Sequence, residues 1–259
     1  MNTVKEFLKR HTTLLQQVRL RSLVRHLLAL PHTTNLTRLA RVFGSDKWGA
    51  HAYTPHYQAH FAKWAFTRIN LLEIGVGGYA HPLAGGESLR MWKRFFPFGR
   101  IYGLDLYDKT ALEERRIHVF QGDQGDPQVL LRVATAIGEI DIIIDDGSHI
   151  NEHVIATFKT LFPLLKQGGI YAIEDTQTSY WPEFGGDSED LLRPSTSMNY
   201  VRSLVDGLNY REIIRPGYQP TYLDQNISSI HFYRNLTVVY KGSNMEESNR
   251  PNVDLVNPA

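Results

Sequence analysis

Five short runs rich in β-branched residues alternate with amphipathic segments through the middle of the chain, and this alternation limits the folds that the sequence can adopt. Continuous apolar runs suit strands that are buried on both faces of a parallel sheet. Regular alternation of strand and helix predicts an α/β fold with an open, doubly wound sheet. The runs are INLLEIGVG (69–77), RIYGLDLY (100–107), RIHVFQGD (116–123), EIDIIIDDG (139–147) and GGIYAIED (168–175), and the helical segments lie near 87–96, 127–137 and 151–166.

Local residue types predict where some elements begin and end. Asn151 is placed to cap the start of the third helical segment, and Gly168 and Gly169 are placed to end it. After residue 195 the pattern changes, and it predicts a helix near 196–208 and a strand at 211–215.

Two closely spaced β segments follow, SIHFYR (229–234) and LTVVYKG (236–242), joined at Asn235. So short a link predicts that they pair antiparallel, as an edge added to the parallel sheet. Five parallel strands followed by an antiparallel edge pair are the outline of a Rossmann-like class I methyltransferase.

The charge is balanced overall but uneven along the chain. The 259 residues contain 28 Lys and Arg against 27 Asp and Glu, whereas a general nucleic-acid clamp is far more basic, so we expect no nucleic-acid partner. Residues 1–41 hold eight basic residues and one acid, which leaves 20 basic and 26 acidic residues in the remainder. The absence of cysteine excludes disulfides, thiolate metal sites and a cysteine nucleophile, and it fits a cytoplasmic location.

The basic N-terminal segment also carries apolar residues at helical spacing. They are Val4, Phe7, Leu8, Leu14, Leu15, Val18, Leu23, Val24, Leu27 and Leu28. Such a helix can dock on an anionic surface, on the acidic body of the chain or on a second subunit. Because charge runs usually solvate a helix face, we expect a helical cap here. Arginines interrupt the segment, so it predicts neither a secretory signal nor a membrane span.

The chain divides into three expected regions. Residues 1–60 form a helical cap and lid, 61–243 the α/β domain and 244–259 a flexible tail. The string GSDKWGAHAYTPHY (44–57) indicates a lid or substrate-facing loop, and residues 177–187 leave the site with aromatic side chains whose faces suit sugar rings.

A glycine-rich turn follows the first β run. Gly75, Gly77 and Ala80 fit the dinucleotide pattern G-x-G-x-x-G/A, which leaves a nicotinamide cofactor as an alternative. Two features disfavour that alternative. The next helix is delayed to about Glu87, and the acid that ends the second run, Asp105, comes 28 residues after Gly77, farther than the usual ~20.

Three side chains at successive strand ends favour an adenosyl cofactor. Asp105 can accept hydrogen bonds from both hydroxyls of a ribose. Asp123 and Gln124, at the end of the third run, are placed to meet an adenine amino group. A surface acid and a Gly-Asp turn are the alternatives for each alone, but the shared crevice favours the adenosyl cofactor.

The densest signal is a group of carboxylates. Asp145 and Asp146 end the fourth run, and Glu174 and Asp175 end the fifth, which lies beside it in a doubly wound sheet. So many carboxylates repel one another unless some are protonated or a cation lies among them. Oxygen ligands without thiolates favour Mg²⁺, Mn²⁺ or Ca²⁺, held by Asp146, Glu174 and Asp175. The alternative is that these are turn and capping acids.

His149 is the candidate general base. It lies three residues beyond Asp146, on the turn into the next helix, where it should face the same crevice. Histidine can take up a proton near neutral pH. His153, one helical turn later, is the competing candidate.

Four motifs together resemble the macrolide-sugar O-methyltransferases of the mycinamicin and tylosin pathways and related actinobacterial glycan methyltransferases. They are GSDKWGAHAYTPHY (44–57), EIGVGGY (73–79), IIIDDGSH (142–149) and YAIEDTQTSYWP (171–182). The resemblance runs from about residue 44 to residue 187. More distantly, the chain is similar to the catechol-type metal-dependent methyltransferases.

The resemblance implies S-adenosylmethionine as methyl donor, catalytic Mg²⁺ on Asp146, Glu174 and Asp175, and His149 as base. It also implies a set of residues that line the cofactor site: Glu73, Gly75, Gly77, Gly78, Tyr79, Ser88, Asp105, Asp123, Gln124 and Asp146. The macrolide enzymes carry a further N-terminal domain without a counterpart here. We therefore expect a smaller glycan acceptor, such as methylmannose units of mycobacterial polysaccharides.

The sequence thus predicts an enzyme that transfers a methyl group to a sugar hydroxyl of a glycan or glycoside. We expect a sugar or short glycan as acceptor, no membrane span and a homo-oligomer, a dimer or higher. The alternatives are a nicotinamide-dependent sugar oxidoreductase and a non-catalytic carbohydrate-binding protein.

Overall fold

The computed structural model describes residues 12–248 and 250. The predictions for residues 1–11, including the helical spacing of Val4, Phe7 and Leu8, and for residues 249 and 251–259 of the tail lie outside that part of the chain. Within the described residues, no helix has the length and hydrophobicity needed to cross a bilayer.

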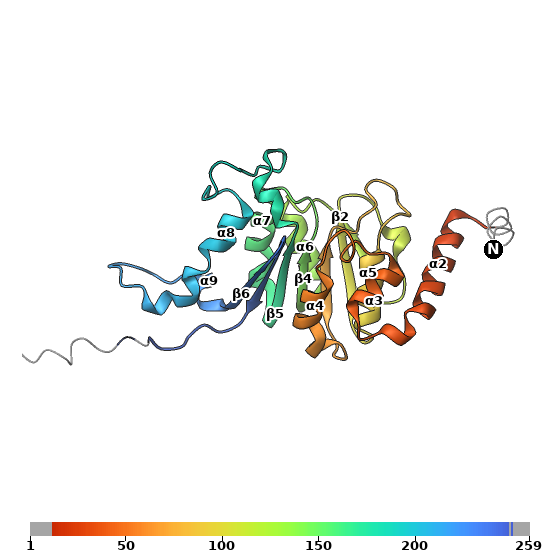
Figure 1. Ribbon diagram of the computed structural model, residues 1–259, viewed down its shortest axis with the longest axis horizontal. Coiled ribbons are helices and arrows are strands. Elements are labelled where there is room, and N and C mark those ends of the chain that lie inside the picture. The colour runs from red at the N-terminus through yellow and green to blue at the C-terminus, as the bar shows by residue number, and fades with distance from the viewer. Residues whose placement is uncertain (1–11, 249, 251–259) are drawn as a thin grey trace, which may run out of the picture.

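Seven strands form one mixed sheet in the order β3-β2-β1-β4-β5-β7-β6 (Figure 1). The first five strands are parallel, and β7 pairs antiparallel with both β5 and β6. The expected doubly wound sheet with an antiparallel edge hairpin is therefore confirmed. The strands are β1 (Asn70–Ile74), β2 (Arg100–Asp105), β3 (Ile117–Gln121), β4 (Ile140–Asp145), β5 (Leu165–Glu174), β6 (Ile227–Tyr233) and β7 (Leu236–Lys241).

Helices cover the sheet and connect its strands. The α-helices are α2 (Leu14–Leu28), α3 (Leu36–Phe43), α4 (Thr54–Phe61), α5 (Glu87–Phe95), α6 (Pro127–Ile137), α7 (Asn151–Leu161), α8 (Ser197–Ser203) and α9 (Tyr222–Asn226). The 3₁₀ turns are η1 (Leu30–His32), η2 (Ala62–Trp64), η3 (Thr110–Leu112), η4 (Phe162–Leu164), η5 (Thr176–Tyr180), η6 (Pro182–Phe184) and η7 (Asp206–Glu212).

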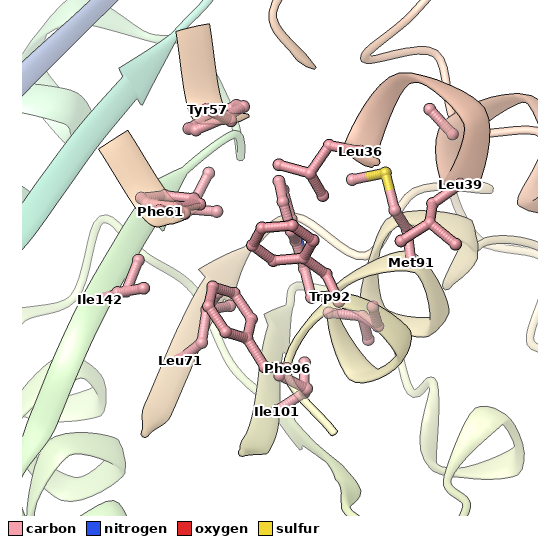
Figure 2. Packing of buried hydrophobic residues seen from close by; sticks show 14 of the residues in the cluster. Leu36, Leu39, Tyr57, Phe61, Leu71, Met91, Trp92, Phe96, Ile101 and Ile142 are labelled. Atoms are coloured by element: carbon pink, nitrogen blue, oxygen red, sulfur yellow. The ribbon is translucent and has the colours of Figure 1, made fainter. Parts of the chain in front are cut away.

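Alternate strand residues feed two hydrophobic cores, because successive side chains point to opposite faces of a sheet. Leu71 and Ile142 face α3, α4 and α5, where the rings of Tyr57, Phe61 and Trp92 fill the layer (Figure 2). Leu72, Ile143 and their neighbours on the other face pack against α6 and α7. The helices α3 and α4 therefore contribute to the core of the sheet. In the sequence analysis, α3 and most of α4 were placed in the separate cap region, residues 1–60.

Three local predictions are wrong. Asn151 does not cap α7; its buried side chain donates to the carbonyls of Thr178 (3.1 Å) and Phe184 (2.9 Å), which ties α7 to the segment after β5. Gly168 and Gly169 lie inside β5, where the pairing register with β4 shifts and Gly168 adopts a φ of +80°.

The third error is the strand expected at 211–215. Residues 206–212 form the 3₁₀ turn η7, and Ile214 after it is 71% exposed. Two adjacent isoleucines resemble a strand in sequence, but among the described residues this segment pairs with no strand of the sheet.

Glu114, which follows η3, anchors α2 to the body. Its carboxylate accepts from Ser22 Oγ (3.1 Å) and pairs with His26 Nε2 (3.1 Å) and Lys93 Nζ (3.0 Å). Burial alone would raise the pKa of Glu114, but the hydrogen bonds from His26 and Lys93 lower it from 4.5 to about 2. A depressed carboxyl pKa stabilises the fold above pH 4.5, and this contribution is lost as the pH falls from 4.5 toward 2.

We expect Glu114→Gln to lower the free energy of unfolding at pH 7 by about 2 kcal/mol, with a smaller difference from wild type at pH 3.5. Urea unfolding at both pH values measures it. Glu139→Gln is the control, because Glu139 is 76% exposed and its pair with Lys166 should contribute little. An equal loss at both pH values would contradict the electrostatic origin.

Candidate functional site

The carboxyl ends of β1, β4 and β5 bring four acidic side chains to one edge of the sheet. Glu73 lies in β1, Asp146 directly follows β4, Glu174 ends β5 and Asp175 follows it. Because β4 lies between β1 and β5, the predicted grouping of Asp146, Glu174 and Asp175 at one edge is found in the structure.

The inner part of this group consists of Glu73, Asp146 and Glu174, and Lys47 lies at its centre. Its Nζ is 2.7 Å from Asp146 Oδ2, 2.7 Å from Glu174 Oε1 and 3.0 Å from Glu73 Oε1. The side chain is only 1% exposed. Sequence reasoning gave this lysine no role, because a single lysine between Asp46 and Trp48 looks like a surface residue.

Three carboxylates surround one ammonium, so two negative charges remain uncompensated if all are ionised. Burial, reinforced by the neighbouring acids, raises the pKa of Glu73, Asp146 and Glu174. Burial opposes the charge of Lys47, but its three partners raise its pKa well above the ordinary value. The group must therefore take up a proton or a second cation.

The outer part of the group offers a place for that cation. Asp146, His149 and Asp175 present ligand atoms that all lie within 4.8 Å of one another. The two carboxylates fit Mg²⁺ or Mn²⁺, which prefer oxygen ligands, and the imidazole of His149 lies beside them. Asp146 and Asp175 therefore fit the predicted metal, whereas the predicted third ligand, Glu174, is held by Lys47 and Tyr57 in the inner part of the group.

His149 is held on the turn before α7 with a φ of +56°. Its Nε2 lies 3.6 Å from Asp175 Oδ2 and 3.9 Å from Asp146 Oδ1. Its Nδ1 is buried and has no hydrogen-bond partner among the described residues. His153 instead contacts Ser148 Oγ (3.2 Å) and lies against Gly125, away from the carboxylates. The geometry favours His149 over His153 as the candidate general base.

Two tyrosines from the 44–57 segment complete the site. Tyr53 donates to Asp175 Oδ1 and Tyr57 to Glu174 Oε1, each at 2.6 Å. Burial opposes ionisation of Asp175, but the hydrogen bond from Tyr53 and the nearby His149 lower its pKa. The segment expected to be a lid or a substrate-facing loop thus forms a wall of the site in this structure, and both hydroxyls are further contacts that sequence reasoning missed.

The glycine-rich turn packs closely against the neighbouring loops at the sheet edge. Gly75 has a φ of +89°, and a Cβ there would lie 2.0 Å from the carbonyl oxygen of Asp146. A Cβ on Gly78 (φ +75°) would lie 2.3 Å from the backbone of Ala84. Gly77 lies between them, and Tyr79 is 88% exposed. Only glycine lets this backbone approach the neighbouring loops so closely, and we call residues 75–79 the glycine cradle.

Glu73 and Ser88 are not on the surface of that cradle. Glu73 is fully buried and accepts from Ser88 Oγ (2.9 Å) and Trp92 Nε1 (3.1 Å). They tie α5 to β1 beneath the glycine-rich turn, so they support that turn.

Asp105 and Asp123 lie at the ends of β2 and β3, as expected. Asp105 accepts from the backbone N–H of Val76 and of Tyr107, each at 2.9 Å, and so fixes the glycine turn. Asp123 accepts from Gly125 N (2.8 Å). This bond forms a turn of the kind that the sequence analysis gave as the alternative to a contact with adenine. Both carboxylates keep free lone pairs for a ligand.

Gln124 is directed into the core rather than toward a ligand. Its amide donates to Asp145 Oδ1 (3.0 Å) and Thr157 Oγ1 (3.2 Å), and its oxygen accepts from Ser148 N (2.6 Å). These bonds occupy the side chain, so the structure does not support its expected contact with an adenine amino group. Burial raises the pKa of Asp145 to about 7, although Gln124 opposes the shift.

A pocket of about 340 Å³ adjoins the carboxylates. Its walls include His51 and Tyr53, whose rings stack at 4.7 Å and which both approach Asp175. The lining residues are Trp48, Gly49, Ala50, His51, Ala52, Tyr53, His56, Arg234 and Asn235. The 44–57 segment and the β6–β7 turn therefore form an aromatic, acid-free pocket at the site.

Sequence comparison finds curated relatives over most of this chain. It is 49% identical over 214 residues to the demethylmacrocin O-methyltransferase of Streptomyces fradiae, covering 82% of this chain and 54% of the relative. It is 51% identical over 213 residues to an 8-demethyl-8-alpha-L-rhamnosyl tetracenomycin-C 2'-O-methyltransferase of Streptomyces olivaceus, covering 81% and 55%. The chain is homologous to the sugar O-methyltransferases. No protein-family model matches it.

Structural comparison confirms the fold of this sugar O-methyltransferase homologue. MycE methyltransferase from the mycinamycin pathway, solved with Mg and SAH, superposes with a TM-score of 0.81 at 45% identity, covering 86% of this chain and 59% of MycE. A complex of MycE with Mg, SAH and mycinamycin VI gives a TM-score of 0.80. The chain spans about half the length of the curated relatives it matches.

Proposed function

We propose that the protein transfers a methyl group from S-adenosylmethionine to a sugar hydroxyl of a glycan or glycoside, with help from Mg²⁺. The observation that carries the proposal is the carboxylate group at the ends of β4 and β5, whose charge Lys47 compensates only in part. The relatives named above support it, because they are sugar O-methyltransferases and MycE was solved with Mg and SAH.

The glycine cradle with Asp105 and Asp123 would hold the cofactor. Asp146 and Asp175 would hold Mg²⁺ beside His149, and Glu174 is proposed as the third ligand that the resemblance implies. When bound, the cation supplies positive charge that orients sugar oxygens and lowers the pKa of the attacking hydroxyl.

The chain's own residues then position the acceptor and move its proton. Methyl transfer is an in-line displacement that needs the acceptor oxygen aligned at about 3–3.5 Å from the methyl carbon. His149 removes the hydroxyl proton as the new bond forms. Tyr53 and Tyr57 hold Asp175 and Glu174 in fixed orientations, so these carboxylates need not reorganise.

The aromatic pocket beside Asp175 is where the acceptor would enter. Rings such as Trp48, His51 and Tyr53 suit the C–H faces of a sugar, and Arg234 and Asn235 can bind its hydroxyls. Trp181, 43% exposed on the segment after β5, can contact the sugar from another side. The acceptor is either a deoxysugar on a small aglycone, as the names of the relatives suggest, or a methylmannose polysaccharide precursor.

The test is a calorimetric titration of the purified chain with S-adenosylmethionine, with Mg²⁺ and with chelator, followed by methyl-transfer assays. The acceptor panel should contain p-nitrophenyl rhamnoside, p-nitrophenyl mannoside and short mannose oligosaccharides. We expect micromolar cofactor binding and transfer that needs Mg²⁺. No cofactor binding in either condition, or full transfer in chelator, would overturn the proposal.

Asp146→Asn should abolish the thermal stabilisation that Mg²⁺ gives the cofactor-free protein, because it removes a carboxylate shared by both parts of the group. Differential scanning fluorimetry across a Mg²⁺ titration measures this, independently of turnover. Glu183→Gln is the control, since Glu183 is an exposed acid on η6. An unchanged Mg²⁺ response in Asp146→Asn would remove this residue as a ligand.

A further inference from the structure

The aromatic pocket beside the carboxylates carries positive charge that no acid in its lining neutralises. Arg234 belongs to this lining, which contains no Asp or Glu. Arg41, on α3, places its guanidinium 5.3 Å from the ring centre of Trp48, another lining residue. Among the described arginines, those that form an ion pair with a carboxylate are Arg25 and Arg193. The two arginines at the pocket therefore keep an unneutralised charge.

The backbone of Arg234 is fixed from both sides. Before it, the hydroxyl of Tyr233 lies 2.9 Å from His60 Nε2. After it, the carbonyl of Asn235 accepts a hydrogen bond from the backbone N–H of Thr176 (3.3 Å). Because Thr176 directly follows the carboxylates at the end of β5, this bond holds the β6–β7 turn, and Arg234 with it, against the site.

We propose that the acceptor sugar carries an oxyanion, a carboxylate or a phosphate, and that this group binds to Arg234. The inference rests on the proposed function, because it specifies the acceptor of that reaction. A guanidinium presents parallel N–H donors that match two oxygens of a carboxylate or a phosphate. A neutral sugar would bind here through its hydroxyls alone and leave the charge of Arg234 unneutralised.

The charges around the pocket also orient such an acceptor. The carboxylates of Asp146, Glu174 and Asp175 repel an oxyanion, and Arg234 attracts it. The oxyanion therefore turns toward Arg234 and leaves a hydroxyl of the same sugar to face His149. The pocket measures about 340 Å³, near the lower limit of the roughly 300–1,000 Å³ of ligand sites, so it suits one sugar with a small charged substituent.

Calorimetric titration of the purified chain in chelator tests this preference without metal and without methyl transfer. Two matched pairs serve as probes: mannose 1-phosphate with methyl mannoside, and p-nitrophenyl glucuronide with p-nitrophenyl glucoside. We expect the anionic member of at least one pair to bind about 10- to 100-fold more tightly than its neutral partner, the usual range for a hydrogen bond to a charged group. The pair with the larger ratio identifies the oxyanion as phosphate or carboxylate.

Three variants assign the preference to Arg234. Arg234→Gln should bring the affinity ratio close to one, because glutamine keeps hydrogen-bond donors but has no charge. Arg234→Lys should keep part of the ratio, since it retains the charge without the planar guanidinium. The matched control is Arg132→Gln, which removes an exposed arginine on α6 outside the pocket and should keep the wild-type ratio. Because both arginines are exposed, we expect all three variants to keep the wild-type melting temperature.

Methyl-transfer assays with the same pairs and Mg²⁺ extend the test to the reaction. The ratio of kcat/KM for the anionic over the neutral acceptor should fall in Arg234→Gln and stay unchanged in Arg132→Gln. A metal ion beside Asp146 and Asp175 also attracts an oxyanion, so the two positions must be separated. An anion preference that appears only with Mg²⁺ and survives Arg234→Gln would place the oxyanion on the metal and overturn the proposal.

Two further results would overturn it. One is equal affinity for both members of each pair. The other is inorganic phosphate that binds as tightly as mannose 1-phosphate, because such an anion site would not recognise the sugar. A failure of the proposed function looks different: if binding depends on Arg234 but no acceptor is methylated, the site binds anionic sugars and the methyl-transfer proposal falls.

Discussion

Replacing Lys47 by methionine is expected to lower the free energy of unfolding by about 3–5 kcal/mol, the largest stability effect of any substitution considered for this protein. Methionine preserves most of the side-chain volume but removes the ammonium that Glu73, Asp146 and Glu174 share. Their charges would then be buried without compensation, and the acids would have to protonate or the site would have to open.

Denaturant unfolding of Lys47→Met beside Lys166→Met measures this effect. Lys166 also pairs with two acids, Glu139 and Asp141, but it is 46% exposed, so its loss should change stability by less than about 1 kcal/mol. If both variants lose equally little, Lys47 does not compensate the cluster, and our account of its charge balance fails.

Replacing His149 by alanine is expected to lower the methyl-transfer rate by about 10²–10⁴-fold, the usual contribution of a general base. Its imidazole faces Asp146 and Asp175 at the place where the acceptor hydroxyl would lie. Because the glycine cradle does not depend on His149, the affinity for S-adenosylmethionine should stay within a few-fold of wild type. Single-turnover kinetics and calorimetry measure the two quantities separately.

His153→Ala is the matched variant, since His153 lies one turn farther along the chain and contacts Ser148 rather than the acids. It should retain most of the wild-type rate. The opposite pattern, a slow His153→Ala and a normal His149→Ala, would transfer the role of base to His153.

Most of the fold could be predicted because its signals are local. The apolar runs that became β1 to β5 and the short link at Asn235 define the sheet without knowledge of distant contacts. The errors arose where contacts with distant parts of the chain, rather than neighbouring residues, determine the local structure. Asn151 looks like a cap, but buried carbonyls of Thr178 and Phe184 claim its side chain.

The residues of the site also divide into those that the sequence predicts and those that it does not. Strand ends must meet at one edge of a parallel sheet, so Asp146, Glu174 and Asp175 could be grouped from sequence. Lys47 and Tyr57 could not, because their partners lie 127 and 117 residues away, and nothing in the neighbouring residues marks such contacts.

These long separations also affect the order in which the protein can assemble. The 44–57 segment precedes the whole sheet, yet it neutralises and fixes acids at the ends of the fourth and fifth strands. Contacts that close such long stretches of chain form slowly, because each requires a large loss of chain entropy. A folding intermediate with a complete sheet but an undocked segment would expose a cluster of unneutralised acids. Those acids would repel one another until Lys47 and the two tyrosines dock, so docking of the 44–57 segment would complete both the fold and the site.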